Sequence, residues 1–117
     1  MCRPHEGGVP PVKLEKPTVW GGDYDGSIIR RYVKRKIAQI SYCYENALLA
    51  NQNLEGTVMA EWTINMAGKP VEVTAKGVSS TVSSCIAGVV ASIEFPKPPQ
   101  VGIYKVRYPF VLHKHGQ

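Results

Sequence analysis

The sequence lacks an apolar run close to the roughly 20 residues that a membrane-spanning helix needs. It also lacks the apolar stretch of a secretory signal peptide, because its first residues are polar and rich in proline. We therefore expect either a cytosolic protein or a piece cut from a longer chain. With 117 residues, of which 44% are hydrophobic and 20% charged, the chain is expected to form one globular domain.

Sequence patterns that mark enzymes are absent too. No glycine-rich phosphate loop and no Cys-x-x-Cys pair occur. Asp23, Asp25 and Glu45 show no paired arrangement for acid–base chemistry. Cys43 and Cys85 lie far in sequence from the histidines, so a nucleophilic cysteine would lack an evident base. We expect a protein that is not an enzyme.

The histidines offer little for a metal. His5, His113 and His115 all lie in terminal segments. His113 and His115, at a spacing of two, could share a metal ion, but two ligands fall short of the four of a structural zinc site. We therefore expect solvated histidines, no metal and no cofactor.

The longest periodic stretch covers residues 25–51 and contains neither proline nor a glycine after Gly26. Its apolar residues recur at three- and four-residue spacing, which predicts one amphipathic helix. This apolar stripe consists of Ile29, Val33, Ile37, Ile40, Tyr44, Ala47 and Leu48. Asp25 or Ser27 is expected to cap its start. Such a helix would span about 35 Å, enough to cover much of a neighbouring sheet.

The rest of the chain alternates between the two periods. Residues 54–65 and 71–75 alternate apolar and polar side chains around a turn at Gly68, which predicts a hairpin. Residues 79–93 return to helical spacing, with a serine pair as N-cap, and prolines end that helix. Residues 101–112 alternate again and predict a third strand.

This order, α-β-β-α-β, predicts an α+β fold with two helices on one face of a three-stranded antiparallel sheet. A helical crossover would place the third strand beside the first, giving the strand order 2-1-3. Pro109 cannot donate to a ladder, so the third strand is expected at an edge. We expect a domain at residues 23–113 and a tail at 114–117. Residues 1–22, rich in proline and glycine, are expected to be a linker or extended arm anchored through Trp20.

Five of the fourteen basic residues lie within the segment RRYVKRK, from Arg30 to Lys36. One interpretation is a solvated outer helix face. The alternative is a nucleic-acid-binding module that grips phosphates with this cluster. No aromatic stacking motif adjoins the cluster, so we expect no nucleic-acid partner.

Five short strings occur in order: SYCYE at 41–45, LEG at 54–56, SCI at 84–86, FPKP at 95–98 and RYPF at 107–110. Together they resemble the AgmX/PglI C-terminal domain family, which is similar to the TonB C-terminal domains. The resemblance covers about residues 25–112. It implies a periplasmic module of a longer inner-membrane-anchored envelope protein, tethered to the membrane outside this chain and linked to gliding motility.

The resemblance also implies a role. In TonB this domain grips an extended peptide of an outer-membrane partner and transmits force from an inner-membrane motor. By resemblance we expect energy transduction through protein–protein interaction, with an extended envelope-protein segment as partner. The long proline- or glutamine-rich spacer typical of such proteins is absent here, apart from the short N-terminal arm.

The two cysteines of the family fall on Cys43 and Cys85, and its tyrosine–glutamate pair on Tyr44 and Glu45. Each cysteine lies about 80° from the centre of its helix's apolar stripe. In an oxidising compartment we expect a Cys43–Cys85 disulfide, worth roughly 4 kcal/mol in the chain-entropy model. The alternative is two unrelated half-buried thiols, and Cys2 is left over as a free thiol or a product of how the chain was cut.

The edge of the third strand is the predicted partner-binding site, because an unpaired edge can accept an extended peptide as a further strand. Pro109 confines pairing to the portion before it. The predicted residues are Ile103, Tyr104, Lys105, Val106, Arg107 and Tyr108. The two basic residues among them favour an acidic partner. The alternative is an edge that is merely blunted, or that the N-terminal arm covers through Trp20.

Overall fold

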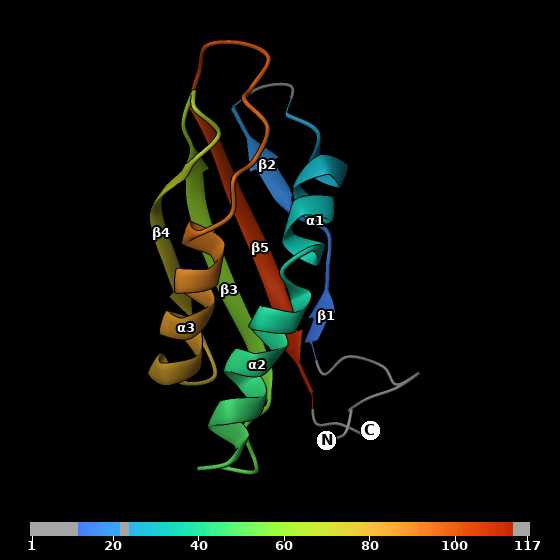
Figure 1. Ribbon diagram of the computed structural model, residues 1–117, viewed down its shortest axis with the longest axis vertical. Helices are drawn as coiled ribbons and strands as arrows, with labels where there is room; N and C mark the ends of the chain where they lie inside the picture. The colour runs from blue at the N-terminus through green and yellow to red at the C-terminus, as the bar shows by residue number, and fades with distance from the viewer. Residues whose placement is uncertain (1–11, 22–23, 114–117) are drawn as a thin grey trace.

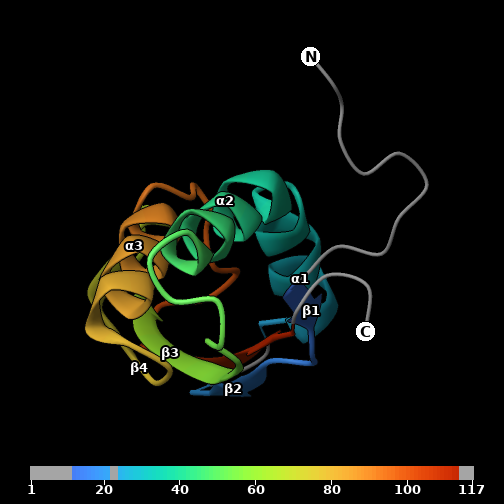
Figure 2. The same ribbon diagram turned by 90° about the horizontal axis from the view of Figure 1, so that it is seen from below.

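The computed structural model describes residues 12–21 and 24–113, and it shows an α+β fold in which helices cover one face of an antiparallel sheet (Figure 1; Figure 2). The strands are β1 (Val12–Leu14), β2 (Thr18–Trp20), β3 (Gly56–Ile64), β4 (Pro70–Lys76) and β5 (Tyr104–Leu112). The helices are α1 (Gly26–Lys34), α2 (Ile37–Leu48) and α3 (Ser80–Ala91). None of these described helices is long and apolar enough to cross a membrane.

The sheet has the order β1-β5-β3-β4, with β2 also paired to β5. The predicted order 2-1-3 of the main strands is confirmed, because β3 lies between β4 and β5. The prediction that the third strand is a sheet edge is wrong. Strand β5 has β3 on one side and both short N-terminal strands on the other. The sheet therefore has five strands rather than three.

The predicted single helix over 25–51 is two helices. The chain leaves helical geometry at Lys36, with φ −105° and ψ 14°. There the Lys36 N–H donates to the Val33 carbonyl, three residues back, at 2.9 Å. No proline or glycine lies at the break, so no local sequence signal marks it. We attribute the change of direction to packing, since a straight rod of that length would diverge from a twisted sheet.

Two predicted helix caps are confirmed. An Asp25 side-chain oxygen accepts from the Ser27 N–H at 2.8 Å at the start of α1. The Ser79 hydroxyl accepts from the Val82 N–H at 3.2 Å at the start of α3. Each cap satisfies one backbone donor that the first helical turn would leave free.

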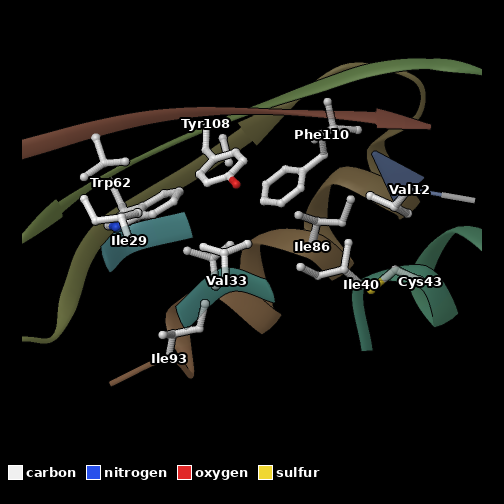
Figure 3. Packing of buried hydrophobic residues seen from close by; sticks show 14 of the residues in the cluster. Val12, Ile29, Val33, Ile40, Cys43, Trp62, Ile86, Ile93, Tyr108 and Phe110 are labelled. Carbon is white, nitrogen blue, oxygen red and sulfur yellow. The ribbon is translucent and has the colours of Figure 1, made fainter. Parts of the chain in front are cut away.

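The hydrophobic core fills the space between the helix layer and the sheet (Figure 3). A row of sheet aromatics points into it, with ring centroids 6.4 Å apart for Trp62 and Tyr108 and 5.0 Å apart for Tyr108 and Phe110. The buried Trp62 Nε1 and Tyr108 hydroxyl have no hydrogen-bond partner in the described part of the chain. Burial raises the pKa of Tyr108 to about 12.

The hairpin turn between β3 and β4 fixes the loop that leads into β5. Gly68 has φ +86°, and a Cβ there would lie 2.1 Å from the Phe95 carbonyl oxygen. The Phe95 N–H donates to the Gly68 carbonyl at 2.9 Å. Gly68 thus allows the close backbone approach that positions the 94–103 segment ahead of β5.

Candidate functional site

The N-terminal arm, residues 12–20, lies along β5 as one interrupted strand. In β1, Val12 pairs with Leu112, and in β2, Trp20 pairs with Lys105. Both pieces are antiparallel to β5, but their registers differ by one position, which the intervening residues 15–17 absorb. Pro17 lies in that interruption and cannot donate to a ladder.

Few arm side chains are buried. Val12 is 3% exposed and joins the core, and Leu14 and Val19 are partly buried against it. Trp20, the expected anchor, keeps 45% of its surface exposed. The arm is therefore held by main-chain pairing with β5 and by a small apolar contact concentrated at β1.

The structure brings most of the predicted site residues onto β5. Ile103 is 74% exposed and precedes the strand, whereas Tyr104, Val106 and Tyr108 are buried on the helix side. Lys105 and Arg107 point to the opposite face. The main chain from Lys105 to Arg107 pairs with Thr18–Trp20.

That pairing corrects the predicted open edge, and it matches the alternative in which the arm covers the edge. The sequence signal for the arm was weak because each of its strands has only three residues and a proline separates them. Period-two alternation needs four or more residues to stand out.

A cluster of four side chains around Arg107 was missed from the sequence. The Arg107 Nε donates to Glu61 Oε2 at 2.8 Å, and the Arg107 guanidinium carbon lies 5.5 Å from the centroid of the Trp20 ring. With Lys105 they line a pocket of about 240 Å³. The residues come from β2, β3 and β5, so only the strand register brings them together.

The Cys43–Cys85 disulfide is present, with Cα atoms 5.7 Å apart, and it joins α2 to α3. Cys43 is buried and Cys85 is exposed. Next to it, the Tyr44 hydroxyl donates to the Leu54 carbonyl oxygen, and burial raises the pKa of Tyr44. Cys2 lies outside the described residues.

The basic cluster lies at α1 and the break after it. Arg30, Arg31, Lys34 and Arg35 are exposed, and the Arg35 guanidinium carbon sits 4.4 Å from the centroid of the Tyr32 ring. The cluster belongs to the helix layer, and its Arg30 lines a pocket with Lys16 and Pro17 of the arm.

Within residues 12–21 and 24–113, no group of three or more histidine, cysteine, aspartate or glutamate side chains could hold a metal ion. His113 is described, while His5 and His115 lie outside the described residues.

No family model, curated protein or solved structure matches the chain. The resemblance to the AgmX/PglI C-terminal domain family stays a prediction.

Proposed function

We propose that the protein is a non-catalytic interaction domain that binds an extended segment of a partner along β5, in exchange with its own arm. One observation carries this proposal. The outer side of β5 already holds an extended segment through antiparallel main-chain pairing, so this edge is geometrically suited to take a further strand. The occupant in this structure is the chain itself.

Exchange is feasible because the arm is held weakly for its length. Ordering the arm costs backbone entropy, which main-chain pairing of six residues and few side-chain contacts offset. A fully buried valine contributes about 1.5–3 kcal/mol, and Val12 is the one residue of 12–20 buried to that degree. Strand β5, by contrast, pairs with β3 over its whole length and does not depend on the arm for its shape.

The setting of this activity rests on the resemblance. We place the domain in the periplasm, as part of a longer envelope protein that couples an inner-membrane motor to envelope or outer-membrane partners in gliding motility. The Cys43–Cys85 disulfide is compatible with an oxidising compartment. Lys105 and Arg107, beside the exchangeable edge, would favour a partner segment with acidic residues.

A titration in trans tests the exchange. The full chain carrying Val12→Asp and Val19→Asp should release the arm, because each change puts a carboxylate where an apolar side chain packs against the core. A synthetic peptide with the sequence of residues 12–21 should then bind this variant. Amide shifts should appear on Ile103, Tyr104, Lys105, Val106, Arg107 and Tyr108, and also on Phe110–Leu112, with which Val12–Leu14 of the peptide would pair.

Two controls complete the test. The unaltered chain should bind the peptide more weakly, because its own arm competes at high effective concentration. A scrambled peptide of the same composition should produce no localised shifts. The absence of localised shifts on β5 of the released variant would overturn the proposal. An octathymidylate that shifts the amides of Arg30–Lys36, with an affinity that falls steeply with salt, would favour nucleic-acid binding instead.

A further inference from the structure

The sheet face that the described helices leave uncovered carries its own chemical pattern (Figure 2). Register places Trp20, Lys105 and Thr63 in one row across this face. Thr18, Arg107 and Glu61 form the next row. Directly opposed residues of antiparallel strands project on the same side, so both rows face solvent together.

Charge on this face is strongly one-sided. Among the paired strand positions, its cations are Lys13, Lys76, Lys105 and Arg107, and its single carboxylate is that of Glu61. Lys13 is 3.8 Å from Glu15 in a loose, exposed ion pair. Two partly exposed apolar side chains lie on this face as well: Val71 is opposite Thr63 in the first row, and Met59 lies in the row beyond Glu61. The surface therefore combines excess positive charge with apolar contact area.

The pocket between Trp20, Glu61, Lys105 and Arg107 lies on this face, and the hydrogen-bond donors of its two cations are incompletely used. Arg107 uses Nε for Glu61, and its remaining guanidinium nitrogens have no acceptor among the described residues. The Lys105 ammonium has no ion-pair partner among those residues either. A volume of about 240 Å³ suits one side-chain-sized acidic group. A carboxylate there would accept charge-assisted hydrogen bonds from both cations.

We propose that this face binds an acidic segment of a partner polypeptide, with one carboxylate in the pocket between Trp20, Lys105 and Arg107. Single-stranded nucleic acid fits less well, because such binders stack successive bases on several aromatics. Trp20 is the only aromatic among the paired positions of this face. Met59 and Val71 offer apolar contacts that a polypeptide side chain can use and a phosphate backbone cannot.

This site is distinct from strand exchange and opposed to it. Trp20 belongs to the arm, so the pocket is complete only while the arm is paired with β5. An acidic segment on the face would hold the arm in place, and a strand added to β5 would remove one wall of the pocket. By linkage, each ligand lowers the affinity of the other by the same factor.

The test uses the full 117-residue chain and capped octaglutamate as probe, followed by amide and indole shifts. Saturable shifts are expected at Lys105, Arg107 and the Trp20 indole. Arg107→Gln and Lys105→Gln should each weaken binding by up to about 5-fold, the range of exposed ion pairs. Glu61→Gln should strengthen it, because the carboxylate that competes for Arg107 is removed. Lys34→Gln, which removes the same charge from α1, is the matched control and should change little.

Three outcomes would overturn the proposal: equal effects of Lys34→Gln and Arg107→Gln, weaker binding by Glu61→Gln, or tighter binding of octathymidylate or anionic phospholipid vesicles than of octaglutamate. Two variants separate this site from strand exchange. Trp20→Ala, which adds no charge, should weaken octaglutamate binding, whereas Val12→Asp with Val19→Asp should enable binding of the arm peptide. Unchanged octaglutamate binding by Trp20→Ala would contradict the role of Trp20.

Discussion

Of the three long strands, β3 lies in the middle, and β4 and β5 each have an outer side that β3 does not pair with. An unpaired strand edge can associate with other chains, and the two strands avoid this in different ways. Strand β4 has no strand on its outer side among the described residues, and it is irregular. Its pairing with β3 shifts register between Glu61 and Thr63, and Glu72 has φ +53°. Strand β5 is regular over nine residues, and its outer side is covered by the arm.

The difference indicates which edge is able to bind. A bulge twists an edge and disrupts the row of donors and acceptors, which discourages a further strand. A long regular edge invites one, so a protein must cover it or use it. The irregular backbone of β4 discourages pairing with a further strand, whereas the outer side of β5 is protected by pairing with the arm.

Removal of the Cys43–Cys85 disulfide should change the free energy of unfolding most, because this bond connects the helices that pack near both strands. The disulfide joins α2, which contacts β1, to α3, which contacts β4. Cys43→Ser with Cys85→Ser should lower the free energy of unfolding by about 4 kcal/mol, because the unfolded chain loses its 42-residue loop constraint. Urea denaturation measures this, and Cys2→Ser is the matched control. If hydrogen exchange showed lost protection only at the backbone amides of β1 and β2, the effect would be local and the predicted global destabilisation would be wrong.

Release of the arm should affect β5 alone. Val12→Asp with Val19→Asp is expected to cost about 2 kcal/mol of unfolding free energy, less than two fully buried valines contribute, because the arm can detach instead of burying charge. The uncovered edge should then self-associate, which light scattering would detect as a dimer. Val71→Asp on β4 is the matched change at a position that is 37% exposed, and it should leave a stable monomer. Dimers in the Val71 variant alone would reverse the assignment of the binding edge.

Alkaline pH should weaken the β5 side first. Burial raises the pKa of Tyr24 and of Tyr108 from 10.0 to about 12; Tyr108 is on β5, and Tyr24 packs edge-on against Tyr104 of β5. An unfolded tyrosine ionises near pH 10, so the stabilisation is complete below pH 10 and is lost as pH rises to about 12. The free energy of unfolding should be measured between pH 10 and pH 12, and amide hydrogen exchange over the same range should show whether β5 loses protection first. Tyr108→Phe should flatten the dependence, and at neutral pH it should be at least as stable because it removes a buried, unpartnered hydroxyl.

The smallest effect concerns the irregular edge. Glu72→Gly should stabilise the protein by about 0.5 kcal/mol, because glycine adopts positive φ without the steric cost of a Cβ but loses more backbone entropy on folding. Glu72→Ala, which keeps the Cβ, should bring no such gain. Thermal denaturation of the three proteins decides between strain and an unrecognised side-chain role. If alanine stabilises as much as glycine, the gain is not due to backbone strain.

Much of the fold follows from periodicity in the sequence. The alternation in β3 and β5 and the helical stripe around Ile86 are long enough to specify their elements and the order of the three main strands. The helix caps at Asp25 and Ser79 were equally local signals. The break at Lys36 was not predictable in this way, since it depends on how α1 and α2 pack against a twisted sheet.

The candidate site was predicted only in part. Residues Ile103 to Tyr108 were identified from one strand, but whether that strand is an edge depends on residues 12–20, more than eighty positions away. The cluster of Trp20, Glu61 and Arg107 depends on register across three strands, which no local pattern specifies. The alternation of apolar and polar residues predicts that the side chains of Glu61 and Arg107 face solvent. It does not predict that the two residues lie opposite each other on neighbouring strands.

The pairing of Val12 with Leu112 has a mechanical consequence. The described chain enters the arm and leaves β5 at the same end of the sheet, so tension between these two points would act across the β1–β5 ladder. Its hydrogen bonds lie perpendicular to the strands and would be loaded one pair at a time, as in a zipper. The arm would peel from Val12 toward Trp20 at low force, while the β3–β5 ladder is not in the load path. Tension alone could then uncover the edge, and a relaxed chain would cover it again.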